Sequence, residues 1–135
     1  MQIDKIRKHF KKDRYATLTG IELLEASTGS ARAKLEISEK HLNSVDTVHG
    51  GVIFTLADFV FAVASNSYGT IAMGINANIS FYKTITEGTL IAEAKEVSFH
   101  KKLASYNIKI TNEKNELVAD FNGMVYRKED NIKFE

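Results

Sequence analysis

The sequence has no cysteine and no proline. Without cysteine the chain forms no disulfide, carries no thiolate nucleophile and offers no thiol ligand to a metal. The four histidines are scattered, so we expect neither a metal site nor a cofactor. Without proline, and with no repeat or low-complexity tract, nothing marks an internal linker. We therefore expect residues 1–135 to form a single domain, long enough to bury a core.

An excess of charge of one sign is also missing. The formal net charge of +1 creates no field that would gather nucleic acid or an anionic membrane. The basic N-terminal segment lacks the apolar core, roughly seven residues or more, of a signal peptide. The apolar run 52–64 is too short to span a bilayer, and Asp58 at its centre would oppose insertion by roughly 3 kcal/mol. We expect a soluble, cytoplasmic protein that binds neither nucleic acid nor membrane.

Hydrophobic periodicity predicts the elements. Apolar residues at helical spacing predict a surface helix over residues 2–12, within an N-terminal segment 1–15. Alternating apolar and polar residues predict six strands, and two turns, at 27–30 and 112–116, join neighbouring strands. The strand ranges are 20–26, 31–38, 75–82, 89–99, 105–111 and 117–126. A long apolar helix follows the second strand. This order predicts an α+β fold in which one face of an antiparallel sheet is buried.

The long helix holds an isolated charge. From Thr47 to Tyr82 the only formal charge is Asp58, in the middle of the helix. Burying an unpaired carboxylate costs several kcal/mol even after relaxation. Either a hydroxyl such as that of Thr55, or a partner lysine, holds this carboxylate, or it does chemistry. The helix is apolar nearly all round, more than one sheet face requires, so we predict that a second subunit covers its far side.

A motif surrounds this charge. The segment 43–58 combines His-Gly-Gly with an asparagine six residues before the histidine and an aspartate nine residues after it. Together with segment 78–83, it resembles the hotdog-fold acyl-CoA thioesterases of the phenylacetate-degradation (PaaI) type, over residues 16–127. The resemblance implies a sheet wrapped around a central helix and dimers whose sheets pair edge to edge. It also implies hydrolysis of the thioester bond of an acyl- or aryl-acyl-CoA to the free acid and CoA.

The sequence departs from the family pattern at two positions, and one role known in some members does not transfer. Asp46 stands where glycine is frequent and Thr84 where proline is common, so Asp46 places a second carboxylate near the mouth of the site. Lys83 stands where some animal members use a serine to orient water, a role that lysine does not take over. We expect Lys83 and the run 100–102 to contact the phosphates of coenzyme A by charge attraction instead.

The chemistry of thioester hydrolysis assigns roles to the motif. Negative charge builds on the carbonyl oxygen, so preorganised N–H donors are needed, and a helix N-terminus supplies them. Gly50 and Gly51 have no side chain to keep a carbonyl away from their backbone. Asp58, the only carboxylate on the helix, is the candidate base or nucleophile. The resemblance adds Asn43 as a side-chain donor to the thioester carbonyl, and we expect His49 to position the loop.

Spacing predicts that two chains share the site. Gly50 and Asp58 are eight residues apart, about 12 Å along a helix, whereas a reacting atom needs both within about 3 Å. Two antiparallel helices about a twofold axis would bring Asp58 of one chain opposite Gly50 of the other, in a homodimer or homotetramer. Phe54 and Phe61 flank Asp58 and could line an acyl pocket, although aromatic residues there are usually core.

The predicted site therefore has a catalytic set, Asn43, His49, Gly50 and Asp58, and a substrate-binding set, Gly51, Phe54, Phe61 and Lys83. Three other functions compete with hydrolysis. A sensor of the same fold would bind acyl-CoA without cleaving it, and a hotdog dehydratase would need a different Asp/His arrangement. A purely structural scaffold would leave Asp58 unexplained.

Overall fold

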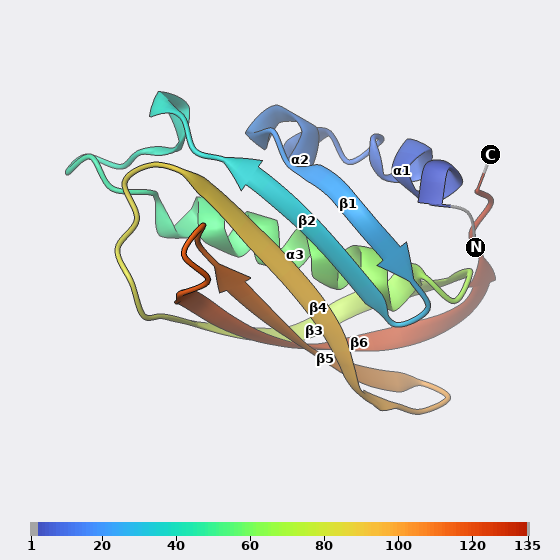
Figure 1. Cartoon of the computed structure of the whole chain (residues 1–135). Coiled ribbons are helices and arrows are strands. Elements are labelled where there is room, and N and C mark those ends of the chain that lie inside the picture. The colour runs from blue at the N-terminus through green and yellow to red at the C-terminus, as the bar shows by residue number, and fades with distance from the viewer. Residues whose placement is uncertain (1–2, 135) are drawn as a thin grey trace.

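The computed structural model describes residues 3–134 as one six-stranded antiparallel sheet curved around a long helix (Figure 1). The helices are α1 (Ile3–Phe10), α2 (Arg14–Thr19) and α3 (Gly50–Asn66), with a 3-10 turn η1 (Glu39–His41). The strands are β1 (Glu22–Ser27), β2 (Ser30–Glu36), β3 (Thr70–Phe81), β4 (Thr89–Phe99), β5 (Leu103–Thr111) and β6 (Leu117–Asn131). They lie in the order β1-β2-β4-β5-β6-β3, so the predicted six strands and central helix are confirmed.

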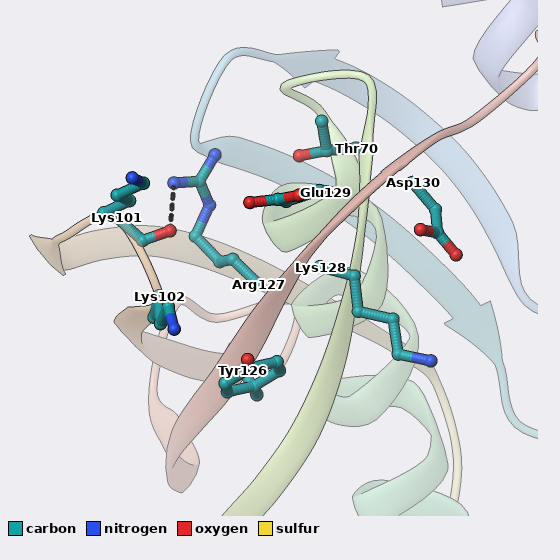
Figure 2. Close-up of a pocket in the computed structure, with 8 residues that line it drawn as sticks. All are labelled: Thr70, Lys101, Lys102, Tyr126, Arg127, Lys128, Glu129 and Asp130. Atoms are coloured by element: carbon teal, nitrogen blue, oxygen red, sulfur yellow. Dashed lines mark hydrogen bonds between the residues drawn. The ribbon is translucent and has the colours of Figure 1, made fainter.

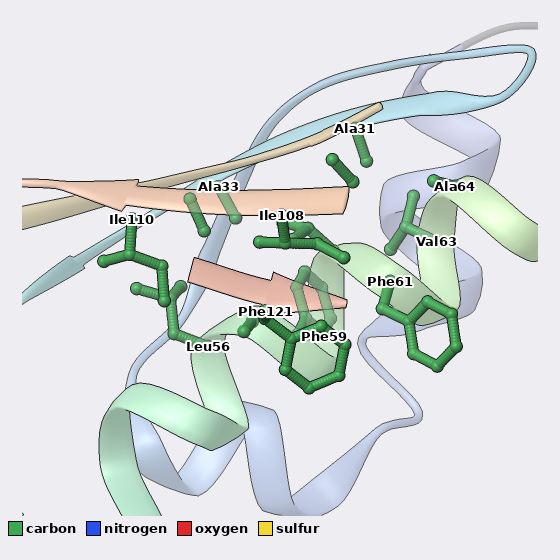
Figure 3. Close-up of a cluster of buried hydrophobic side chains, with 14 of the residues drawn as sticks. Ala31, Ala33, Leu56, Phe59, Phe61, Val63, Ala64, Ile108, Ile110 and Phe121 are labelled. Carbon is green, nitrogen blue, oxygen red and sulfur yellow. The ribbon is translucent and has the colours of Figure 1, made fainter. Parts of the chain in front are cut away.

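The core lies between α3 and the concave face of the sheet. Leu56, Val60 and Val63 on α3 are fully buried, as are Ala33 on β2 and Ile108 on β5. The small alanines on the inner strands let the helix approach the sheet closely, while larger residues fill the space around it (Figure 3). None of the described helices is both long and apolar enough to cross a membrane.

The N-terminal segment differs from the prediction of one surface helix over residues 2–12. Residue 2 lies outside the described residues, and the chain forms two helices because Asp13 caps α2, accepting a hydrogen bond from the N–H of Ala16 at 3.0 Å. Nor is α1 confined to the surface, since Ile6 is buried and Phe10 packs edge-on against Phe59 of α3. The chain thus covers one flank of α3 itself, a flank that the sequence assigned to a second subunit.

Strand β3 forms one edge of the sheet and is longer than predicted, starting at residue 70 rather than 75. Ile79 pairs with Phe121 and Ala77 with Gly123, so this side of β3 faces the same way as the buried core of β6. Even so, Phe81 is 51% exposed, although its ring lies against Gly50 at the start of α3. The edge therefore presents both unpaired backbone groups and apolar side chains to solvent.

Candidate active site

The first turn of α3 is capped by His49. Its backbone lies outside the helix, and its Nδ1 accepts a hydrogen bond from the N–H of Gly51 at 2.8 Å. An accepting Nδ1 carries no proton, so the imidazole is neutral in this arrangement, with its hydrogen on Nε2. The carbonyl of His49 accepts from the N–H of Val52 at 2.9 Å. The histidine thus satisfies two of the amides that a helix N-terminus leaves without partners.

One amide of this turn stays free. Among residues 3–134 the N–H of Gly50 has no acceptor, although its two successors are both held by His49. The Gly50 backbone lies against the ring of Phe81, where an added Cβ would sit 3.4 Å from the ring. Gly50 is therefore the amide of this turn that remains available, and its role as the oxyanion donor stays a prediction. The N–H of Gly51 is already used by the cap, and the expectation that Gly51 contacts substrate stays a prediction.

The loop before α3 is organised by Asn43. Its Oδ1 accepts from the N–H groups of Val45 at 3.0 Å and Thr47 at 3.1 Å. Its Nδ2 donates to the Thr47 hydroxyl at 2.9 Å, which leaves the second hydrogen of this amide for another acceptor. Asp46 adopts φ +60, a left-handed conformation that glycine adopts without strain. This explains physically why glycine suits the position.

Asp58 lies eight residues further along the same unbroken helix, about 12 Å from Gly50 along its axis. Its carboxylate is exposed and forms no hydrogen bond or ion pair with residues 3–134. The Thr55 hydroxyl donates to the Gly51 carbonyl at 2.7 Å instead, so it does not hold the carboxylate. Desolvation by the packed atoms around it, and then the nearby charge of Asp13, raise the pKa of Asp58 above its usual value.

The two predicted acyl-pocket residues have different surroundings. Phe54 is 36% exposed and meets Phe121 edge-on, with ring centroids 5.2 Å apart. Phe61 is only 3% exposed, and a Cβ on Gly123 would lie 2.7 Å from its ring. Phe61 therefore packs the core between α3 and β6 in the single chain, and its contact with substrate stays a prediction (Figure 3).

The predicted phosphate-binding residues also differ from one another. Lys83 lies 3.3 Å from the carboxylate of Glu116, so its charge is largely compensated. Lys101 and Lys102 instead border a groove of about 590 Å³, whose other lining residues are Thr70 and 126–130 (Figure 2). No ion pair within residues 3–134 involves the lysines of this groove. Sequence reasoning missed Arg127 and Lys128. They form an adjacent basic pair directly after the last predicted strand, and this pair was the signal that could have identified them.

Arg127, on one side of the groove, is held in place by several contacts. Its guanidinium lies over the ring of Phe99, 3.9 Å from the centroid, and donates to the carbonyls of His100 at 3.1 Å and Lys101 at 3.2 Å. These contacts fix the turn between β4 and β5 against β6 (Figure 2). The lysines of that turn are thereby held beside the groove.

Comparison with known proteins identifies the family. Residues 46–119 match the model of the thioesterase superfamily, a range that contains the His-Gly-Gly sequence and Asp58. The chain belongs to the thioesterase superfamily. Acyl-coenzyme A thioesterase PaaI of Escherichia coli is 33% identical over 119 residues, covering 87% of this chain and 85% of that protein. A provisionally named esterase of Archaeoglobus fulgidus is 41% identical over 119 residues, covering 87% and 77%.

Solved structures confirm the hotdog fold of this thioesterase. The E. coli PaaI structure aligns with a TM-score of 0.89 at 30% identity, covering 96% of this chain and 98% of that one. A variant of PaaI from Thermus thermophilus aligns with a TM-score of 0.83 at 31% identity, covering 86% and 100%. The chain is thus a thioester hydrolase by family, which favours catalysis over the sensor alternative.

Proposed function

We propose that this chain hydrolyses the thioester bond of an acyl- or aryl-acyl-coenzyme A, with water, to a free acid and CoA. The observation that carries the proposal is an unpaired carboxylate, Asp58, on the same helix as a free backbone donor, the Gly50 N–H. Such a pair supplies the two functions that the reaction needs, a base or nucleophile and a stabiliser of the oxyanion.

In the proposed reaction, the two groups come from different chains of a homodimer. The Gly50 N–H of one chain donates to the thioester carbonyl oxygen, where negative charge develops. Asp58 of the other chain either removes a proton from the attacking water or attacks the carbonyl carbon itself. With Asp58 as base, the proton it takes from water passes to the CoA sulfur as the carbon–sulfur bond breaks, and the free acid forms directly. With Asp58 as nucleophile, the CoA thiolate leaves and takes a proton from solvent, and water then hydrolyses the acyl–aspartyl anhydride to the free acid. Each dimer has two such sites, related by the twofold axis.

Two surfaces of the single chain support this assembly. The edge strand β3 carries apolar side chains that its own helix does not cover, among them Ile75, which is 56% exposed, and Phe81. On α3, Phe54 and Asp58 remain exposed in the single chain. A second copy paired along β3 would cover both surfaces and place its own α3 beside the first. A tetramer would contain this contact twice, once in each of two dimers.

Neighbouring residues are assigned supporting roles. His49 holds the first turn so that the Gly50 amide stays free. Asn43 offers the second hydrogen of its side-chain amide to the thioester carbonyl. Phe54 and Phe81, both exposed next to this turn, offer an aromatic surface to the acyl group.

The groove beside the β4–β5 turn is proposed to receive the phosphates of coenzyme A. Its lysines, at 101, 102 and 128, form no ion pair within residues 3–134, unlike Lys83, although two carboxylates, Glu129 and Asp130, also line the groove. Asp58 lies eight residues before the end of α3, which is about 12 Å along the helix axis. Thr70, which lines the groove, follows four residues after the end of the helix. We place the reaction in the cytoplasm, where acyl-CoA thioesters are formed and used.

The test is a turnover assay on a panel of alkyl- and aryl-acyl-CoA thioesters, with release of free thiol as the measurement. We expect thiol release by the native chain and none above background by Asp58→Asn. The same acyl groups on N-acetylcysteamine, which lacks the phosphates, should be cleaved with a higher KM. Absence of thiol release across the whole panel would overturn the proposed function. Equal KM values for both carriers would overturn the phosphate assignment alone.

A further inference from the structure

A buried histidine, His41, joins the end of α2 to the loop that carries the proposed oxyanion donor. Its side chain is 3% exposed, and both ring nitrogens are engaged. The N–H of Ser38 is 2.9 Å from Nδ1, and the carbonyl of Thr19 is 2.6 Å from Nε2. A backbone N–H only donates and a carbonyl only accepts, so Nδ1 is the acceptor and the ring hydrogen is on Nε2.

The main chain of the same residue reaches the active-site turn. The carbonyl of His41 accepts from the N–H of His49 at 2.9 Å, and the adjacent Leu42 forms a β-bridge with Val48. His49 is the residue that caps α3 and holds the Gly51 amide. His41 therefore connects the last turn of α2 to His49, the cap that leaves the Gly50 N–H free.

The contact with α2 satisfies carbonyl groups at the end of that helix. Thr19 is the last residue of α2, and the last carbonyls of a helix have no partner within it. The ring of His41 satisfies this one, while Lys40 donates to the carbonyl of Leu18 at 3.0 Å beside it. Two consecutive side chains thus anchor η1, and the loop that follows it, to the end of α2.

We propose that His41 is a positioning residue of the thioesterase site, which fixes the turn around His49 so that the Gly50 N–H points at the substrate carbonyl. It touches no substrate and acts through the His49 backbone. The inference rests on the proposed function, because it assigns a purpose to the same donor.

Three substitutions separate the two ring contacts. His41→Gln keeps a donor that can reach Thr19, His41→Asn keeps an acceptor for Ser38, and His41→Leu removes both. A displacement of about 1 Å at a reacting group costs on the order of a hundredfold in rate. We expect His41→Leu to lower kcat by about ten- to a hundredfold with little change in KM. The Gln and Asn variants should each restore part of kcat, and they remain informative if the Leu variant fails to fold.

A matched control lies at the other end of α3. Ser67 is also buried, at 2% exposed, and also joins two backbone groups, accepting from the Gly29 N–H at 2.7 Å and donating to the Ala64 carbonyl at 2.6 Å. Ser67→Ala should lower the denaturation midpoint as a His41 variant does, yet leave kcat unchanged. If the His41 variants also keep the native kcat, His41 only stabilises the fold and the proposal is wrong.

A spectroscopic readout does not depend on turnover. With ¹⁵N-glycine labelling, the Gly50 amide signal can be assigned by its loss in Gly50→Ala. This signal should shift or broaden in His41→Leu and His41→Asn, and remain in place in Ser67→Ala. An unmoved Gly50 signal would overturn the proposal. Failure of the native chain on every thioester would instead overturn the proposed function, and the signal would still report whether His41 positions the amide.

Discussion

The N–H of Gly51 donates to Nδ1 of His49 at 2.8 Å, and a side chain on Gly51 would lie only 3.0 Å from that nitrogen. The two glycines of the motif therefore have different purposes. The second glycine makes room for the imidazole cap, whereas the first leaves its amide for another acceptor. A single histidine thus determines which amide of the turn is available for chemistry.

This relationship predicts the stability of cap variants. His49→Ala removes the acceptor of the Gly51 N–H, and loss of an N-cap costs about 1 kcal/mol in the free energy of unfolding. His49→Asn keeps a short acceptor at the cap and should cost less. Urea denaturation of the three proteins measures the difference. Equal stabilities of the alanine variant and the native chain would show that the cap contributes nothing.

Asp58→Asn should separate fold from chemistry. The substitution is nearly isosteric and removes no hydrogen bond, because the carboxylate has no partner within residues 3–134. Turnover of the best acyl-CoA should fall by at least about a hundredfold, as expected for the loss of a general base. Binding of the substrate, measured by calorimetry, should persist. Near-native turnover would mean that Asp58 is not the reacting carboxylate.

The raised pKa of Asp58 has a consequence for stability. Folding favours the protonated form, because desolvation and the charge of Asp13 disfavour the carboxylate. This contribution to stability is fully present below the unfolded-state value of 3.8 and is lost as pH rises through the higher folded-state pKa. Asp58→Asn should therefore gain stability relative to the native chain as pH rises through this window. Denaturation midpoints of both proteins across pH measure the gap, and a constant gap would contradict the prediction.

Much of the fold could be predicted from the sequence, because strands repeat every two residues and the helix is apolar along its whole length. The start of β3 was missed because residues 70–74 do not alternate. The short helix α2 was missed because its six residues carry no apolar repeat, and only its cap by Asp13 marks it. These elements are determined by packing and caps, which a periodicity search does not detect.

The site was predictable only where the chemistry is local. Gly50 and Asp58 follow from the ends and the charge of one helix. The burial of Phe61 was not foreseen because residues three apart on a helix share a face only in part, and the glycine on β6 that contacts its ring is distant in sequence. The ion pair of Lys83 was missed for the same reason, since its partner Glu116 lies in the turn before β6, far away in sequence. Contacts between distant segments decide which candidates face solvent.

The loop conformation gives a prediction about Asp46. At φ +60 a β-branched side chain is strained, whereas glycine is not. Asp46→Val should lower the free energy of unfolding by about 1–2 kcal/mol, while Asp46→Gly should leave it within a few tenths of the native value. Asn115, at φ +61 in the β5–β6 turn, is a control with the same backbone conformation outside the active-site loop. Valine at position 115 should cost stability but not turnover, and equal tolerance of valine and glycine at 46 would contradict the strain argument.

The shared site can be tested by mixing two inactive variants. Asp58→Asn removes the carboxylate, and Asn43→Ala removes the side-chain amide that organises the loop before His49. Gly50 and Asp58 of one chain are about 12 Å apart, so we expect each site to take its loop from one chain and its carboxylate from the other. In a mixed dimer one site then carries both lesions and the other carries none.

After subunit exchange by mild denaturation and refolding, half of the dimers are mixed, and each has one intact site. Activity should therefore recover to about a quarter of the native value. Each variant refolded alone is the control and should stay inactive. If loop and carboxylate served the same site from one chain, every site in the mixture would carry a lesion. Activity would then remain at the level of the separate variants, and sedimentation would show whether the chains had paired at all.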